Sequence, residues 1–264
     1  MTGPTERGGV LIAIDDHPTN ATTLEVGVAL GRALERTVTA SHVADAAPAP
    51  VRAAADRAGV DLQVRSGPVV PTLIEVVAAP EVAVAVVGRG QLARADRPAG
   101  HVALALIEAT DTPTLLVPPG TSAGLDAPLQ TVLLPLDGAM ATEAAVAPTV
   151  GLLADAALEV VVVHVLADQE VPVFLDQAHH DLDAWGQEFL ARHAVTGSAP
   201  RIVLRAGTPG RSVLEVASTE AADLIVLGWS QDLSVGRAEV VRLLLADAKV
   251  PVLLVPVEPH GGAS

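Results

Sequence analysis

The chain repeats itself, and this internal duplication constrains its fold more than any other feature of the sequence. The hydrophobic segment Val10–Asp15 recurs as Val132–Asp137, and the pair His42-Val43 recurs as His164-Val165, in each case 122 residues later. Three later landmarks recur in the same order at separations of 138 to 140 residues: Arg65–Gly67 with Arg205–Gly207, Val86–Gly88 with Val226–Gly228, and Thr112–Pro118 with Val250–Pro256. Matching landmarks in matching order indicate two copies of one unit.

The spacing of these landmarks predicts the domain organisation. The separation grows by 18 residues between Val165 and Arg205, which predicts an insertion of that size in the second copy. The stretch around 118–128 is rich in Pro and Gly and has no periodicity, as is typical of a linker. The sequence therefore predicts a first domain over residues 1–120, a linker over 121–128 and a second domain over 129–258.

Hydrophobic runs within each copy predict the fold class. Runs of four to seven residues rich in Val, Leu and Ile alternate with longer segments rich in Ala, Leu and Glu. Because these runs are continuously apolar, they are typical of parallel strands covered on both faces. The pattern predicts an α/β fold with a largely parallel sheet in each copy. In the insertion, Phe174, Leu182 and Phe189 follow helical spacing, which predicts an added amphipathic helix near 174–195.

Local signals predict where some helices begin and end. A capping box at Thr22–Glu25 opens a helix that reaches Glu35, and Gly59 closes a helix over 51–58. In the second copy Pro148 falls inside the equivalent of the first helix. Proline lacks the backbone N–H of a helical residue, so we expect a kink or a restart there.

Composition excludes several classes of function. The chain has a net charge of −15, a single lysine and 2% aromatic residues, whereas nucleic-acid-binding surfaces need basic stripes and stacking rings. The absence of cysteine excludes thiolate nucleophiles, thiolate zinc sites and disulfides. The sequence shows neither a signal peptide nor an apolar run of about 18 residues, which predicts a cytoplasmic protein with no membrane partner.

The first candidate site residue is the aspartate after the first predicted strand. Ligands of open parallel sheets bind beyond the carboxyl ends of the strands. Asp15 lies there in one copy and Asp137 in the other. A carboxylate in this position can hydrogen-bond the base or sugar of a ligand. Alternatively, it ties down the loop that precedes the next helix.

The second candidate is the loop after the fourth predicted strand, which covers residues 88–102 in the first copy. Small residues let the backbone approach a phosphate, and a helix that begins near Gly100 offers unpaired amides. Arg89, Arg94 and Arg97 supply positive charge for an anion. The alternative is an arginine-bearing surface loop that binds nothing.

Three familiar site types are excluded. The Gly88-x-Gly90-x-x-Ala93 pattern resembles a dinucleotide fingerprint, but that fingerprint follows the first strand and not the fourth. Lys249 lies outside any glycine loop, which excludes a Walker-type phosphate loop. No Gly-x-Ser-x-Gly elbow occurs to supply a serine nucleophile, because the pattern at Gly120–Gly124 lies in the linker-like stretch and not at a strand-to-helix turn. The sequence therefore predicts no catalytic residue, and a binding protein more readily than an enzyme.

The order and spacing of the landmarks resemble those of the universal stress proteins, in a tandem form with two such domains. The resemblance covers nearly all of both copies and is carried in the second by Gly207–Glu215, Ala222–Gly228 and Pro251–Pro256. It implies two tandem doubly wound five-stranded parallel sheets in the order 3-2-1-4-5, with adenine nucleotide alpha-hydrolase-like or flavodoxin-like layering. It also implies pairing of the fifth strands, Pro113–Val117 with Pro251–Val255, as a pseudo-dimer within the chain, and a homodimer of chains.

Many universal stress proteins bind ATP through Gly-x2-Gly-x9-Gly-Ser/Thr after the fourth strand, framed by the first-strand Asp and the second-strand His-Val. In the first copy the resemblance implies a nucleotide site made of Asp15, Val43, Gly88, Arg89, Gly90, Gly100, His101 and Val102. This copy departs from the motif, because Gln91 replaces the second glycine and His101 replaces the Ser or Thr. The spacing is also one residue short.

The second copy departs further, and its equivalent positions predict a degenerate site: Asp137, Val165, Gly228, Ala238 and Glu239. Gln231 replaces the second glycine, and Ala238-Glu239 replaces Gly-Ser. Repulsion between the Glu239 carboxylate and a triphosphate costs on the order of several kcal/mol when both are desolvated. We therefore expect no ATP binding in the second copy.

The predicted helix of the insertion offers either a metal site or a solvated face. Asp176, His180 and Asp183 share one face of the predicted helix, and imidazole with carboxylates can hold a divalent metal. A solvated face opposite the apolar one is the simpler interpretation, so no metal is expected. His42 and His164 end the second strands and are expected to be structural, since neither has a carboxylate partner nearby along the chain.

The resemblance implies a regulatory stress-response protein whose first domain binds ATP or another adenine nucleotide and which acts on an unidentified protein partner. The alternative is a nucleotide-independent interaction scaffold of the same fold, favoured by the departures at Gln91 and Glu239. Slow ATP hydrolysis is a third hypothesis, and it lacks an identifiable general base.

Overall fold

A computed structural model describes the chain over residues 8–17, 20–90, 98–121, 128–137, 140–156, 158–166, 201–234 and 238–257. The predicted insertion helix near 174–195, with Asp176, His180 and Asp183, lies outside the described residues. So do Gln91, Arg94 and Arg97 of the candidate loop, and most of the predicted linker.

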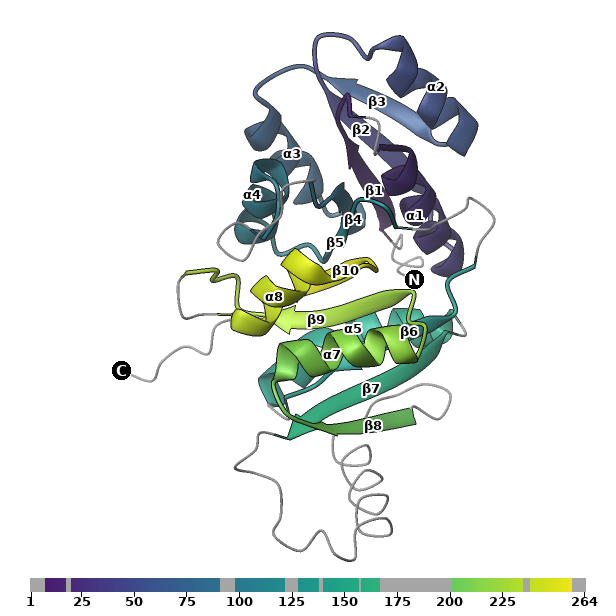
Figure 1. Cartoon of the computed structure of the whole chain (residues 1–264). Coiled ribbons are helices and arrows are strands. Elements are labelled where there is room, and N and C mark those ends of the chain that lie inside the picture. Colours follow the sequence, from purple (N-terminus) through teal and green to yellow (C-terminus); the bar gives the residue numbers. More distant parts are fainter. Residues whose placement is uncertain are drawn as a thin grey trace, which may run out of the picture.

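The first half alternates strands and helices along the chain (Figure 1). Its elements are β1 Gly9–Ile14, α1 Asn20–Ala33, β2 Val38–Val43, α2 Ala49–Ala58, β3 Asp61–Arg65, α3 Val69–Val77, β4 Val82–Gly88, α4 His101–Ala109 and β5 Thr114–Val117. The strands pair in parallel in the order β3-β2-β1-β4-β5. Helices α3 and α4 lie on one side of this sheet, and α1 and α2 lie on the other.

The second half repeats the same strand order. Its elements are β6 Thr131–Pro135, α5 Met140–Asp155, β7 Glu159–Leu166, β8 Arg201–Ala206, α7 Pro209–Thr219, β9 Leu224–Trp229, α8 Glu239–Asp247 and β10 Val252–Pro256. Its strands run parallel in the order β8-β7-β6-β9-β10. Both halves thus have the order 3-2-1-4-5, and the predicted fold class is confirmed.

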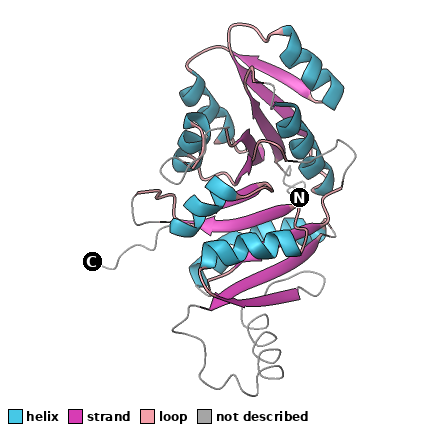
Figure 2. Ribbon diagram, in the orientation of Figure 1, coloured by secondary structure: helices cyan, strands magenta, loops and turns pink. Residues whose placement is uncertain are grey.

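The two sheets join through their fifth strands. β5 and β10 pair antiparallel, with Val252 opposite Leu116, Leu253 opposite Leu115 and Leu254 opposite Thr114. One ten-stranded sheet therefore runs through the molecule with helices on both faces (Figure 2). The pairing of fifth strands within the chain, which the sequence predicted, is confirmed.

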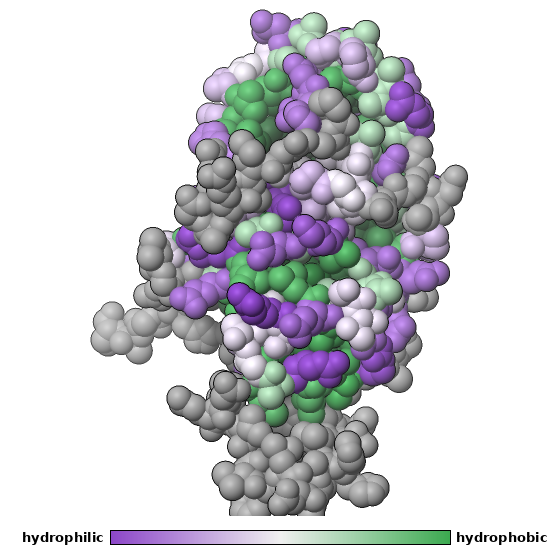
Figure 3. Space-filling model, in the orientation of Figure 1, coloured by the Kyte–Doolittle hydropathy of each residue, from purple (hydrophilic) through white to green (hydrophobic). Residues whose placement is uncertain are grey.

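The hydrophobic core has two layers, one on each face of this sheet, and each layer contains residues of both halves. Leu115 and Leu253 belong to one layer, whereas their neighbours Leu116 and Leu254 belong to the other. Both faces of these strands are covered, so the residues that point to either face are apolar. This explains the continuous apolar runs of the sequence. The outward side of α7 carries hydrophilic side chains (Figure 3).

The helix ends follow the local signals. α2 ends at Gly59, which adopts a left-handed conformation with φ of 68° and donates its N–H back to the helix. Pro148 interrupts nothing, because α5 continues through it from Met140 to Asp155. Pro148 has no N–H to donate to the Ala144 carbonyl, and both residues lie on the exposed side of the helix. None of the described helices combines the length and the apolar character that a membrane span requires.

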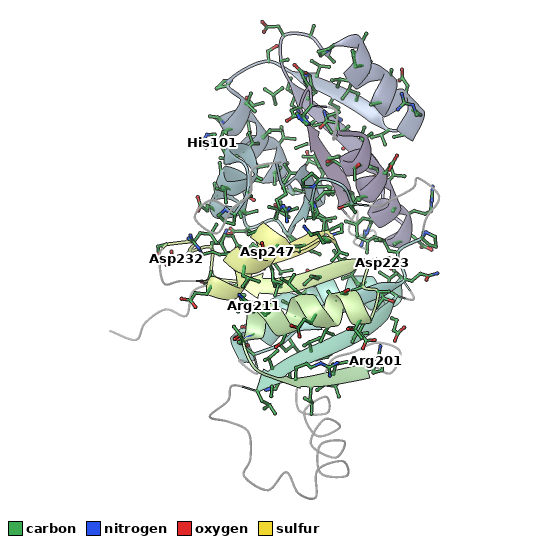
Figure 4. The ribbon with its side chains drawn as sticks, in the orientation of Figure 1. His101, Arg201, Arg211, Asp223, Asp232 and Asp247 are labelled. Carbon is green, nitrogen blue, oxygen red and sulfur yellow. The ribbon has the colours of Figure 1, made fainter. Side chains whose placement is uncertain are left out.

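Two polar contacts join elements of the second half. One links the residue before β9 to the start of β6, and the other links the start of β8 to the residue after α7. The Asp223 carboxylate accepts hydrogen bonds from the backbone N–H groups of Gln130, at 2.8 Å, and Thr131, at 3.0 Å. Arg201 Nη2 donates to Glu220 Oε2 at 2.6 Å. Figure 4 marks Asp223 and Arg201 on this half.

The ion pair at Glu220 predicts a pH-dependent stability. The hydrogen bond from Arg201 holds the pKa of Glu220 below its usual value, against the opposing effect of burial. A lowered pKa in the folded state means that the pair stabilises the fold above the unfolded pKa of about 4.3 and is lost as the pH falls through the folded pKa. The Arg201 side chain is 47% exposed, so we expect Glu220→Gln to lower the free energy of unfolding by less than about 1 kcal/mol at pH 7.

Urea unfolding of both proteins across pH checks this prediction. The difference between wild type and Glu220→Gln should shrink toward zero as the pH falls below about 4.3. A difference that stays constant from neutral to acidic pH would contradict it.

Candidate functional site

A pocket of about 450 Å³ lies at the carboxyl ends of β1, β2 and β4 in the first half. The pocket is lined by seven of the eight residues that the sequence predicted for a first-half site: Asp15, Val43, Gly88, Gly90, Gly100, His101 and Val102. β1 and β4 are neighbours in the sheet, and the chain leaves them in opposite directions along it. That is the switch point at which open α/β sheets form a crevice.

Two glycines bring the loop after β4 against the start of α4. Gly90 has a φ of 85°, and a Cβ added to it would lie 3.3 Å from the N and Cα atoms of Gly100. The Gly100 N–H donates to the Arg89 carbonyl at 2.7 Å. A side chain at Gly90 would strain the backbone and push the two segments apart. This contact explains why a glycine stands at position 90.

The N-terminus of α4 opens into the pocket. Gly100 is its N-cap, and His101, Val102 and Ala103 form its first turn and line the pocket. The N–H groups of a first helical turn have no partner within the helix, and the helix dipole makes this end positive. This end of the pocket therefore suits an anionic group.

Asp15 directly follows β1 at the rim of the pocket. Its Oδ1 accepts a hydrogen bond from the His17 N–H at 2.8 Å, and its backbone N–H donates to Asn20 Oδ1 at 3.4 Å. The Asn20 side chain in turn donates to the Asp15 carbonyl. The loop-tying role considered for this aspartate is thus present, while its exposed carboxylate also lines the pocket.

His42 has a partner that the sequence did not indicate. The ring is buried, with Nδ1 3.1 Å from the Ile14 carbonyl oxygen and Nε2 3.4 Å from Asp16 Oδ1. The register of β1 against β2 places Ile14 beside His42, which brings in Asp16 from 26 residues away along the chain. His164 repeats the first contact, with Nδ1 2.9 Å from the Leu136 carbonyl oxygen. Both histidines therefore join the ends of two strands.

Arg89 lies elsewhere than predicted. Its Nη1 donates to the Ala248 carbonyl of the second half at 2.9 Å, and the residue is only 7% exposed. Burial lowers the pKa of Arg89, and the nearby Asp247 carboxylate opposes that effect. The side chain is not among the groups that line the pocket. The prediction of Arg89 as a nucleotide contact is corrected, because its guanidinium serves the boundary between the halves.

The equivalent positions of the second half are arranged differently. A Cβ added to Gly228 would lie 2.8 Å from Thr142 Cγ2 and 3.1 Å from Val146 and Val257, so α5 packs directly on this strand end. Trp229 stands in the place of Arg89 and is buried. Side chains of α5 and Val257 thus fill the space beside Gly228.

The start of α8 differs in charge from the start of α4. Ala238, the N-cap, has a left-handed φ of 46°, and Glu239 puts a carboxylate in the first turn. Glu239 and Asp137 are exposed, and Val165 is half-buried in β7. A carboxylate at the positive end of the helix already meets the dipole that a phosphate would use. The arrangement disfavours an anionic ligand at this end.

Within the described residues, no group of three or more histidine and carboxylate side chains is placed to hold a metal ion.

Comparisons with known proteins point to one family. The family model described as the universal stress protein family matches residues 128–256. A universal stress protein from Archaeoglobus fulgidus DSM 4304 is 13% identical, with 94% of this chain and 98% of that one aligned and a TM-score of 0.64. No curated protein matches the chain.

Two structures from Pseudomonas aeruginosa are similarly related. A functionally unknown protein of strain PAO1 is 11% identical, covering 95% of this chain and 92% of its own, with a TM-score of 0.68. A universal stress protein of strain UCBPP-PA14, described only provisionally as such, is 12% identical, covering 95% and 93%, with a TM-score of 0.65. At these identities the likenesses show a shared fold along both halves.

Proposed function

This chain belongs to the universal stress protein family, and we propose that it is a regulatory member that binds ATP or another adenine nucleotide at one site, in its first half. The observation that carries this proposal is the convergence of the predicted residues on one pocket of about 450 Å³. That volume is within the range of about 300–1,000 Å³ typical of small-molecule sites.

The pocket offers a different environment to each part of a nucleotide. Val43, Val69 and Leu73 supply apolar surface for a base, and the Asp15 carboxylate lies at the rim to accept a ribose hydroxyl. The first turn of α4, from His101 to Ala103, supplies backbone N–H groups for phosphate. In this arrangement the base lies under α3 and the phosphates lie at the start of α4.

A nucleotide-independent scaffold is the second candidate. It is favoured by Arg89, whose guanidinium faces the second half, so that cation is withdrawn from the phosphate end of the pocket. In this case the protein would act through its surface alone, without regulation by a ligand.

A ligand panel monitored by thermal unfolding separates the two functions. ATP, ADP, AMP, cyclic AMP and adenosine are each added at millimolar concentration to the intact chain. A nucleotide site predicts a rise in Tm for at least one of them, since a ligand at about 100 times its Kd stabilises the folded state by about 2.7 kcal/mol. No shift with any of the five would support the scaffold and overturn nucleotide binding.

The proposal extends to the organisation of the protein. We take residues 1–120 and 129–258 as two universal-stress-type domains joined by a linker at 121–128. We further propose that two chains associate into a homodimer. The protein would act on an unidentified protein partner in the cytoplasm.

A further inference from the structure

Two side chains cross the boundary between the halves and bind backbone carbonyls at equivalent places. Arg89 of the first half donates from Nη1 to the Ala248 carbonyl, which follows α8. Gln231 of the second half donates from Nε2 to the Thr110 carbonyl, which follows α4, at 2.9 Å, and to the Ile107 carbonyl at 3.3 Å. Each half thus caps the last helix of the other.

The capped carbonyls belong to buried residues. Ala248 is fully buried and Thr110 is 3% exposed. The last carbonyls of a helix have no partner within it, so an unpaired one in a buried position is costly. The two contacts therefore hold the helix ends at the boundary, where Figure 4 marks Asp247 on α8.

Both contacts lead to the walls of the first-half pocket. Arg89 lies between Gly88 and Gly90, and its own carbonyl accepts the Gly100 N–H that joins the two pocket loops. Gln231 holds the C-terminal end of α4, whose N-terminal end opens into the pocket. The second half thus contacts the loop at the proposed phosphate end, and it contacts α4 at the opposite end of that helix.

We propose that the second half serves as a brace for the pocket of the first half, with Arg89 and Gln231 as positioning residues. This inference rests on the proposed function, because the pocket is the proposed nucleotide site. The brace gives a function to the second half, whose own site is degenerate. The second half fixes the distance between the Gly88–Gly90 loop and α4. Thermodynamic linkage makes this coupling reciprocal. The free energy by which the Arg89 contact with Ala248 favours ligand binding equals the free energy by which a bound ligand favours that contact.

Two variants remove the crossing bonds and leave an unbranched apolar side chain at each position. In Arg89→Met and Gln231→Met, we expect the affinity for ATP, measured by isothermal titration calorimetry well below the Tm, to fall about tenfold. Arg89→Lys should recover part of the loss, since its ammonium can still donate to the Ala248 carbonyl. Asp223→Asn is the control: it weakens contacts within the second half only, so it should lower the Tm and leave the affinity unchanged.

Hydrogen exchange supplies a second readout. ATP should slow the exchange of backbone amides in residues 239–248 of the wild type and leave them unaffected in Arg89→Met. Equal ATP affinity in wild type, Arg89→Met and Gln231→Met would overturn the brace.

Failure of the proposed function has a different signature, because the wild type would then bind no ATP. The brace is in that case judged by the Gly100 amide, whose bond to the Arg89 carbonyl the brace maintains. Faster exchange of this amide in Arg89→Met supports the brace, and unchanged exchange overturns it.

Discussion

We expect Gly100→Asp to abolish stabilisation by ATP and Ala238→Asp to leave it unchanged. A Cβ on Gly100 lies 3.6 Å from the Arg89 carbonyl oxygen and 3.9 Å from the Gly90 Cα, at the junction of the two pocket loops. The added carboxylate then stands at the first turn of α4, where the proposal puts a phosphate. Repulsion between two desolvated anions is worth several kcal/mol, so we expect an affinity loss of more than about 100-fold.

The variant is suited to this test because it should fold. Gly100 is the N-cap of α4 and has an extended conformation, with φ of −66° and ψ of 159°. Aspartate is among the preferred N-cap residues. Ala238→Asp makes the same change at the N-cap of α8, and aspartate tolerates its left-handed conformation. Thermal unfolding with and without ATP measures both variants, and an unchanged ATP response in Gly100→Asp would contradict the site.

Leu115→Asp in the first half is expected to destabilise the second half as well. Leu115 is fully buried in β5 and lies opposite Leu253 of β10. A carboxylate there loses its water and has no paired cation among the apolar groups of that core layer. We expect the free energy of unfolding to fall by more than about 4 kcal/mol, a large share of the roughly 5–15 kcal/mol that holds a domain together.

The two tryptophans report the result in the half that was not mutated. Trp185 and Trp229 both belong to the second half, so tryptophan fluorescence follows that half while circular dichroism follows the whole chain. In urea, both signals should shift to lower denaturant in Leu115→Asp and stay close to wild type in the control Leu115→Met. If the fluorescence transition of Leu115→Asp matched that of wild type, the shared core would be disproved.

The features that could be predicted from the sequence are those encoded within one copy. Strands, their continuous apolar character and the glycines of the pocket loop follow from local pattern, and the duplication supplied each landmark twice. The order of the strands and the pairing of β5 with β10 came from the resemblance to a family. Asp15 and the loop over 88–102 could be named because the carboxyl ends of parallel strands meet at one edge of the sheet, whereas Val43 was implied by the resemblance.

The features that could not be predicted depend on contacts between distant parts of the chain. Arg89 and its acceptor are 159 residues apart, and Gln231 and Thr110 are 121 apart. The sequence alone predicts Arg89 as an anion contact and Gln231 as a lost glycine, because both stand in the phosphate motif. Their actual partners arise only when the two halves pack together. Likewise, the approach of Asp16 to His42 depends on the register of β1 against β2.

The central claim is that one half holds a nucleotide site and the other supports it. The number of ATP molecules bound per chain tests this claim most directly, by calorimetric titration of the wild type, Gly100→Asp and Ala238→Asp. We predict one ATP per wild-type chain, none in Gly100→Asp and one in Ala238→Asp. Two ATP molecules per wild-type chain, or a single one that Ala238→Asp removes and Gly100→Asp spares, would contradict it.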